Sequence, residues 1–197
     1  RCEALIAANT QGVERAHLVA FASDGALLQE LFTADGIGTQ VSAHSEDLIR
    51  QARLEDVADI VEIIRPLEEA GVLVPRSRTQ LEQEIAHFFI AELDGVVVGC
   101  CAIYTFADAA ELACVAVHEN YRHQYSAMGI GGALLEAAER AAEAHGAKSL
   151  FVLTTQTQEW FVSHGFSPAD VESLPQSKQS LYNWQRGSAV LQKSLNF

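Results

Sequence analysis

An apolar run, a glycine-rich turn and a long alanine-rich helix follow one another in the middle of this chain, and they constrain its fold more than any other feature. Residues 112–117, LACVAV, are typical of a buried strand, and a helical pattern extends over residues 131–146. Between them lies the segment 129–132, GIGG. Such a turn presents backbone N–H groups and the positive end of the helix dipole, which suit a phosphate. Glu111 directly precedes the apolar run. The pattern therefore indicates chemistry on a phosphorylated cofactor.

The segments around this feature predict a mixed α/β sheet flanked by helices. Apolar or alternating segments predict strands over residues 48–52, 88–93, 96–106, 110–117 and 149–154, and a strand or hairpin within 181–195. Helical spacing predicts helices over residues 56–70, 77–88, 131–146 and 158–164. The dipeptide Asp94-Gly95 favours a tight hairpin between two of these strands.

The first section of the chain, up to about His44, has a pattern of its own. Residues 13–21 predict a strand, residues 25–33 a short helix, and residues 35–39 a turn. A strand–helix piece of this size is too small to bury a core. We therefore expect it to pack on another part of the protein or to belong to a domain that lies outside this chain.

Composition argues against several classes of function. The net charge of −13 argues against nucleic-acid binding, because phosphate backbones are bound by basic surfaces. We expect no membrane contact, since no signal peptide is visible and no apolar run reaches the roughly 18 residues that span a bilayer. The histidines and cysteines show no metal-ligand spacing, so we expect no metal. Cys100, Cys101 and Cys114 lie in apolar runs, which favours buried thiols in a reducing cytoplasm.

Four phrases of the sequence resemble the GNAT acetyltransferases. They are PLEEAGVLVPRSR (66–78), ELACVAVHENYR (111–122), SLFVLTTQTQEWFVSHGF (149–166) and LPQSKQSLYNWQRGSAVL (174–191). The last phrase is the most specific, and with it the chain most resembles the acetyltransferase domain of the N-acetylglutamate synthase family. The resemblance implies a GNAT N-acetyltransferase domain over residues 45–197. Residues 1–44, which contain LFTADGIGT, resemble the C-terminal remnant of an amino-acid-kinase-like domain.

The resemblance implies direct transfer of an acetyl group from acetyl-CoA to the α-amino group of L-glutamate in a ternary complex, the first step of arginine biosynthesis. An ammonium group has no lone pair, so a base must first take a proton, and the resemblance assigns this role to Glu111. The alternative interpretation of Glu111 is an exposed charge at the end of a strand.

The resemblance also implies a group that protonates the departing thiolate. Many GNAT enzymes have a tyrosine where this chain has Phe161, and a phenyl ring has no proton to give. The synthase family places a hydroxyl at the end of the SLFVLT strand instead, which is Thr154 here. The alternative interpretation of Thr154 is an ordinary residue of the sheet ladder.

The acetyl-CoA site follows from the same resemblance. The pantetheine arm is expected to pair with the backbone of Val115, Ala116 and Val117, and the pyrophosphate to meet the amides of Gly129, Ile130, Gly131 and Gly132. Ser126 stands where the family usually has a long donor, Arg or Gln. We therefore expect Arg122 or Gln124 to replace this donor.

Glutamate carries two carboxylates, and in a chain with a net charge of −13 they require placed cations. The resemblance supplies substrate-binding candidates, with Cys114 lining the site rather than acting as a nucleophile: Arg76 or Arg78, Cys114, Lys178, Arg186 and Ser188. The alternative interpretation of the arginines and the lysine is solvated surface charge.

Two other functions are compatible with these residues. The fold serves many acceptors, so the chain is alternatively an acetyltransferase for another amine. A non-catalytic acyl-CoA-binding regulatory module is the second alternative, favoured by Phe161 and the irregular phosphate loop. As partners, the resemblance implies L-glutamate, the amino-acid-kinase-like domain of a longer protein, and further copies of the chain in a homo-oligomer.

Overall fold

The structure is a computed structural model that describes residues 2–13, 15–21, 24–32, 37–42, 48–93, 95–122 and 129–195. The chain divides into two compact units, Arg1–Asp47 and Leu48–Phe197. The domain boundary that the sequence predicts, between residues 44 and 45, lies outside the described residues. Within the described ranges, no helix combines the length and the apolar character that crossing a membrane requires.

The first unit contains α1 (Cys2–Thr10), β1 (Arg15–Leu18), α2 (Ala26–Phe32) and β2 (Thr39–Ser42), with β1 and β2 paired antiparallel. Among its described residues, Ala26 is the one apolar residue that is buried, whereas Phe21 and Phe32 are exposed. The predicted strand and helix are present as β1 and α2. Helix α1 and strand β2 were not predicted, and β2 already includes Thr39 of the predicted turn.

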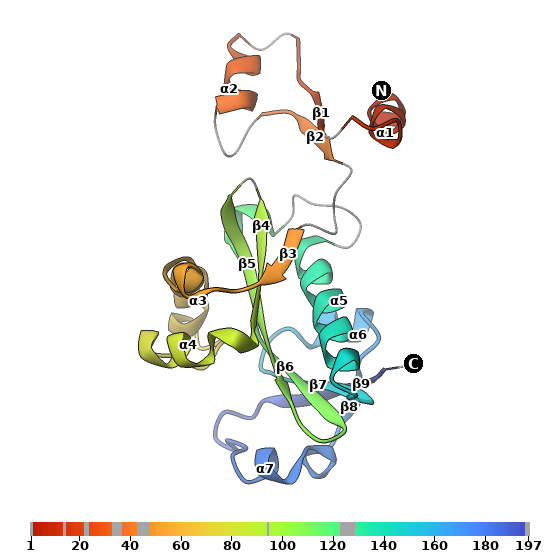
Figure 1. Cartoon of the computed structure of the whole chain (residues 1–197). Helices are drawn as coiled ribbons and strands as arrows, with labels where there is room; N and C mark the ends of the chain where they lie inside the picture. Colours follow the sequence, from red (N-terminus) through yellow and green to blue (C-terminus); the bar gives the residue numbers. More distant parts are fainter. Residues whose placement is uncertain are drawn as a thin grey trace. The chain divides into compact units, whose positions relative to one another are not determined.

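The described part of the second unit is built on a seven-stranded sheet with the order β3-β4-β5-β6-β7-β9-β8 (Figure 1). Its strands are β3 (Ile49–Gln51), β4 (Phe88–Leu93), β5 (Val96–Thr105), β6 (Ala109–Val117), β7 (Ser149–Thr154), β8 (Ser167–Ala169) and β9 (Ala189–Ser194). Neighbouring strands are antiparallel except β6 and β7, which run parallel. The mixed α/β sheet predicted from the sequence is therefore confirmed.

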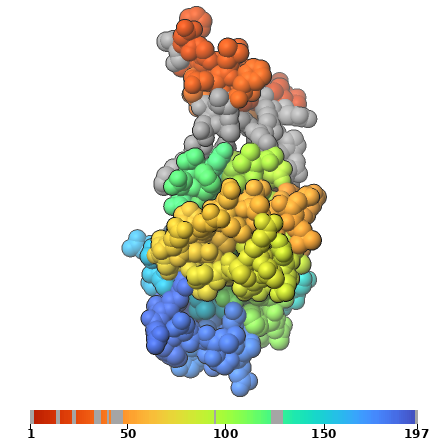
Figure 2. Space-filling model, turned by 90° about the vertical axis from the view of Figure 1, so that its left-hand side faces the viewer, coloured from red at the N-terminus to blue at the C-terminus, as the bar shows by residue number. Residues whose placement is uncertain are grey.

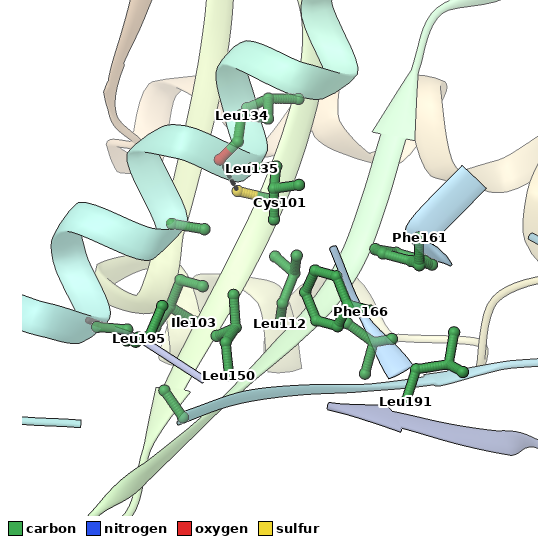
Figure 3. Close-up of a cluster of buried hydrophobic side chains, with 14 of the residues drawn as sticks. Cys101, Ile103, Leu112, Leu134, Leu135, Leu150, Phe161, Phe166, Leu191 and Leu195 are labelled. Atoms are coloured by element: carbon green, nitrogen blue, oxygen red, sulfur yellow. Dashed lines mark hydrogen bonds between the residues drawn. The ribbon is translucent and has the colours of Figure 1, made fainter. Parts of the chain in front are cut away.

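Helices cover both faces of this sheet (Figure 1). They are α3 (Val57–Glu69), α4 (Arg78–Glu84), α5 (Gly129–Ala144), α6 (Gln158–Ser163) and, in the C-terminal loop region, α7 (Gln176–Gln179). Apolar side chains of α5 and α6 pack on one face around Leu134, Leu150 and Phe166 (Figure 3). The other face packs on α3 and α4 around Ile60, Leu81 and Phe88. Burial of apolar surface on both faces stabilises this unit, and each Å² that is removed from water contributes about 20 to 30 cal/mol of free energy.

Most predicted elements are present, and one boundary was wrong. The helix predicted to run from residue 77 to Phe88 ends at Glu84, is followed by a 3-10 turn over Ile85–His87, and gives way to β4 at Phe88. Phe88 pairs with Ala102 of β5 and is fully buried. The helical spacing of Leu81, Ile85 and Phe88 thus continued by chance into a buried strand.

The hairpin predicted at residues 94–95 is confirmed, since Leu93 of β4 pairs with Val96 of β5 across a two-residue turn. Asp94 itself lies outside the described residues, and Gly95 has a φ of +80° that suits such a turn. The tail forms a strand only over β9. Strand β8 and helix α7 were not predicted, because three- and four-residue elements carry little periodicity.

Candidate active site

A cavity of about 370 Å³ opens where β6 and β7 part. The two parallel strands pair from Ala109 and Ser149 as far as Glu111 and Phe151. Beyond that point residues 112–117 of β6 and residues 152–154 of β7 line the cavity instead of pairing with each other. The remaining lining residues are Leu67, Val72, Leu73, Arg122, Gly129, Ile130, Gly131, Thr157, Trp160 and Phe161. The lining is mostly apolar and includes the main chain of one strand edge.

The N-terminus of the 16-residue helix α5 forms one wall of this cavity through Gly129, Ile130 and Gly131. A Cβ atom on Gly131 would lie 3.2 Å from Cζ2 of Trp160, so a side chain here would crowd the wall. Arg122 also lines the cavity, and its Nε donates a hydrogen bond to the carbonyl of Val117 at 3.0 Å. A helix N-terminus with an adjacent guanidinium favours an anionic group.

Strand β6 has an irregular backbone at Cys114. Cys114 has a φ of +53°, the one positive φ among the described non-glycine residues. Cys114 and Val115 together lie opposite a single residue of β5, Cys101, which makes a β-bulge. Cys114 packs with the cluster under α3 and α4, whereas Val115 packs on the α5 side. The bulge therefore brings the Cys114 thiol to the face of the sheet that carries the charged side chains described next, at a cost in backbone strain.

Glu111 is the buried carboxylate of the site, with 6% of its surface exposed. It is the last residue of β6 that pairs with β7, directly before the first cavity residue, Leu112. Its Oε2 lies 2.5 Å from Nζ of Lys178 in α7. No described group donates a hydrogen bond to this oxygen in acceptable geometry, so the contact is a close ion pair. A residue far away in the sequence thus supplies the charge that accompanies a buried carboxylate.

Tyr104 lies beside this ion pair. It is directly opposite Glu111 in the register of β5 and β6, and residues opposite each other in an antiparallel pair point to the same face. Its ring lies 5.9 Å from Nζ of Lys178, and its hydroxyl donates a 2.5 Å hydrogen bond to Oε2 of Glu84. Burial and this hydrogen bond raise the pKa of Tyr104 well above its ordinary value. The phenol therefore stays a neutral donor at physiological pH.

Arg76 contributes a second cation on the same face. Burial alone would lower the pKa of its guanidinium, but the surrounding Cys114, Tyr104 and Glu84 outweigh burial, and the pKa is raised. Its Nη1 donates to the carbonyl of Val74 at 3.1 Å. We call Arg76, Glu84, Tyr104, Glu111 and Lys178 the charged cluster.

Thr154 lies at the end of β7 and lines the cavity together with Thr157. The Thr154 hydroxyl accepts a hydrogen bond from the backbone N–H of Thr157 at 3.1 Å and shares a second one with the Thr157 hydroxyl at 2.9 Å. Because the two hydroxyls are paired, the proton of one can point into the cavity only when the other hydroxyl donates the hydrogen bond between them.

Arg186 joins two loops of the second unit. Its Nη2 donates to the carbonyl of Val72 at 2.6 Å and to that of Gly71 at 3.3 Å, which ties the segment 180–188 to the turn after α3. Figure 2 shows the blue C-terminal segment beside the orange and yellow surface of the α3–α4 region. In the same segment the hydroxyl of Tyr182 donates to the carbonyl of Ser188, whose side chain is buried.

The structure places the sequence-predicted site residues in three groups. The cavity wall contains Cys114, Val115, Ala116, Val117, Gly129, Ile130, Gly131 and Thr154. The charged cluster contains Glu111, Lys178 and Arg76, and the loop 180–188 carries Arg186 and Ser188. Gly132 is buried within α5, and Arg78 is exposed, with its Nε 2.9 Å from a carboxylate oxygen of Glu82. Gln124 lies outside the described residues.

Tyr104, Glu84 and Thr157 were not predicted from the sequence. The signal that points to Tyr104 is its register opposite Glu111, which depends on strand pairing across the turn at residues 106–108. Within the described ranges, no group of three or more His, Cys, Asp or Glu side chains is arranged to hold a metal ion.

Comparison with known proteins agrees with this geometry. Residues 84–168 match the family model described as an acetyltransferase (GNAT) domain. An amino-acid acetyltransferase of Azotobacter vinelandii is 53% identical over 186 residues, which are 93% of this chain and 42% of that protein. An amino-acid acetyltransferase of Aeromonas salmonicida is 48% identical over 195 residues, which are 98% of this chain and 43% of that protein.

A solved structure is similar over almost the whole chain. It is N-acetylglutamate synthase from Neisseria gonorrhoeae complexed with coenzyme A and N-acetyl-glutamate, with a TM-score of 0.74 and 40% identity. The match covers 99% of this chain and 46% of that one. The chain therefore spans less than half the length of each of these three relatives.

Proposed function

Because this chain carries an acetyltransferase domain of the GNAT family, as predicted, we propose that it transfers the acetyl group of acetyl-CoA to the α-amino group of L-glutamate. The observation that carries the proposal is the buried Glu111–Lys178 ion pair at the point where β6 and β7 part. It places a carboxylate that accepts a proton, and a cation that suits an acidic substrate, next to the cavity.

The cavity fits the acyl-CoA substrate. The main chain of Val115 to Val117 lines it where β7 no longer pairs, so a pantetheine amide finds strand-type partners there. The N-terminus of α5 at Gly129 to Gly131 and the guanidinium of Arg122 suit the pyrophosphate. Arg122 is thus our proposed replacement for the donor that Ser126 does not provide.

In the reaction the acceptor nitrogen loses two protons and the sulfur gains one. Glu111 takes a proton from the ammonium group of the acceptor, and the amine nitrogen then attacks the thioester carbonyl. The new C–N bond forms as the C–S bond breaks, the electron pair leaves on sulfur, and the nitrogen releases its second proton to solvent. The paired hydroxyls of Thr154 and Thr157 provide a hydrogen-bond donor to this thiolate, which takes its proton from solvent or from this pair. Because Phe161 of α6 is buried in the core, its ring excludes water but supplies no proton.

The acceptor lies on the face of the charged cluster. We propose that Lys178 and Arg76 hold its carboxylates, since both cations lie on the face of the sheet that carries Glu111. Arg186 acts by joining the two loops that enclose this face, and Ser188 and Cys114 line it. Arg78 is engaged with Glu82 on the surface and is not included.

The chain covers 42% of its Azotobacter relative. We propose that it acts as the C-terminal part of a longer cytoplasmic protein of arginine biosynthesis, whose preceding domain is amino-acid-kinase-like. Its assembly into a homo-oligomer stays a prediction.

A thiol-release assay tests the proposed function. The purified chain and acetyl-CoA are incubated with glutamate, aspartate, glutamine, lysine and a simple amine. We expect CoA release to be fastest with glutamate and N-acetylglutamate to form in equal amount. Equal or higher rates with a cationic or neutral acceptor would assign the chain to another amine. Binding of acetyl-CoA without transfer to any acceptor would assign it to a regulatory module.

A further inference from the structure

The ion pair between Lys178 and Glu111 joins two side chains of unequal freedom. The Glu111 side chain is 8% exposed and is fixed on the central strand β6. The Lys178 side chain is 27% exposed and extends from the four-residue helix α7 in the C-terminal loop region. A lysine side chain is long and flexible, and it presents a compact point charge. In this pair Lys178 is therefore the member that can move.

The Nζ atom of Lys178 lies 2.5 Å from Oε2 of Glu111, so the ammonium group of the lysine occupies the approach to this carboxylate oxygen. Glu111 in this arrangement is poorly suited to take a proton from an acceptor. The neighbouring charged and titratable groups do not replace the lysine: the hydroxyl of Tyr104 donates a hydrogen bond to Glu84, and Arg76 donates one to the carbonyl of Val74. Removal of Lys178 thus leaves Glu111 as a buried carboxylate whose Oε2 is open to the ammonium group of an acceptor.

We propose that Lys178 alternates between two carboxylates. It holds Glu111 while the acceptor site is empty, and it moves to a carboxylate of the acceptor when an acidic amino acid binds, which frees Glu111 to take the ammonium proton. An acidic acceptor thereby activates its own base, and an amine without a carboxylate does not. This inference rests on the proposed function and adds a reason for its substrate class: an acidic acceptor is favoured by a higher rate of transfer as well as by tighter binding.

The test replaces Lys178 by methionine, which keeps the length of the side chain and removes its charge. Two acceptors are compared: glutamate, and n-butylamine, which has no carboxylate. We expect Lys178→Met to lower kcat/KM for glutamate by about 10- to 100-fold through the lost charge-assisted contact. We expect the same variant to raise the rate with n-butylamine by about tenfold, because Glu111 is no longer held.

A matched control is available in the same chain. Lys193 contacts Glu139 at the same distance, 2.5 Å, and its side chain is also 27% exposed, but this pair joins β9 to α5 away from the cavity lining. Lys193→Met should leave both rates near those of the wild type. An n-butylamine rate that is unchanged or reduced in a folded Lys178→Met variant would overturn the proposal, because a lysine that only binds substrate, or only supports the fold, cannot produce the increase.

If Lys178→Met does not fold, the proposal is tested on the wild-type chain instead. Propionate, a carboxylate without an amine, should then accelerate acetylation of n-butylamine by drawing Lys178 away from Glu111, and no acceleration would overturn the proposal. The two hypotheses fail differently. A wild type that does not prefer glutamate contradicts the proposed function, whereas a wild type that prefers glutamate with no gain for n-butylamine in the variant contradicts the alternation.

Discussion

The cavity between β6 and β7 and the charged cluster beside it differ in how they are built. The cavity is lined by apolar side chains, by the main chain of residues 112–117, and by the glycine-rich end of α5. The cluster is made of side chains from five separate elements or loops, and its members balance one another: Lys178 contacts Glu111, and Tyr104 donates to Glu84. Under the proposed function, the cavity recognises acyl-CoA by shape and backbone, and the cluster recognises the acceptor by charge.

This contrast has a consequence for substitutions. A change in the cavity should act on acyl-CoA binding and leave the acceptor requirement intact, and a change in the cluster should do the reverse. Substitutions at Glu111, Gly131 and Arg186 test the separation, and substitutions at Cys114 test the strained backbone of β6.

The largest effect is expected for Glu111→Gln. The amide cannot take a proton, and a positioned base contributes about 10² to 10⁴ in rate, so kcat should fall by that factor. Calorimetric titration with CoA should give wild-type affinity, because Glu111 does not line the cavity. Turnover equal to that of the wild type would show that Glu111 is not the base.

The second-largest effect is expected for Gly131→Val, which changes the cavity wall and leaves the charged cluster intact. A Cβ atom at this position would lie 3.2 Å from Trp160, and the branched side chain would narrow the cavity wall. We expect CoA affinity to fall by about 10- to 100-fold while the KM for glutamate at saturating acetyl-CoA stays near the wild-type value. A change in the glutamate KM with unchanged CoA affinity would contradict the assignment of this wall.

A smaller effect is expected for Arg186→Ala. Its guanidinium joins the segment 180–188 to the carbonyls of Gly71 and Val72, so its loss should loosen the loops around the acceptor and raise the glutamate KM by about tenfold. Arg140→Ala is the control, because Arg140 is an exposed residue of α5 that contacts only Glu136 in the described residues. A glutamate KM that does not change in Arg186→Ala would contradict this positioning role.

The smallest effect concerns the backbone at Cys114. Both Cys114→Gly and Cys114→Ala remove the thiol, but only glycine adopts a φ of +53° without strain. We expect the glycine variant to be more stable than the alanine variant by about 1 kcal/mol in the free energy of unfolding, measured by urea titration. Ala113→Gly, at a position of ordinary φ in the same strand, should destabilise by about 0.5–1 kcal/mol. A more stable Cys114→Ala variant would show that the bulge carries no strain.

The same contrast explains what the sequence could predict. The strand, turn and helix that form the cavity adjoin one another in the chain, so their apolar period and their glycines were sufficient to predict a glycine-rich helix N-terminus after β6. The pairing of Tyr104 with Glu111 depends on the register of two strands, and the contact of Lys178 depends on a four-residue helix with almost no periodicity. The bulge at Cys114 has no sequence signal, because a glycine would be the usual residue at such a φ.

Kinetics with both substrates varied test the central claim that the cavity and the charged cluster are occupied at the same time. Initial rates are measured at several fixed concentrations of glutamate while acetyl-CoA is varied. Direct transfer in a ternary complex predicts double-reciprocal lines that intersect. Parallel lines, together with an acetylated chain that can be isolated before glutamate is added, would contradict it and would assign the acetyl group to an enzyme nucleophile such as Cys114.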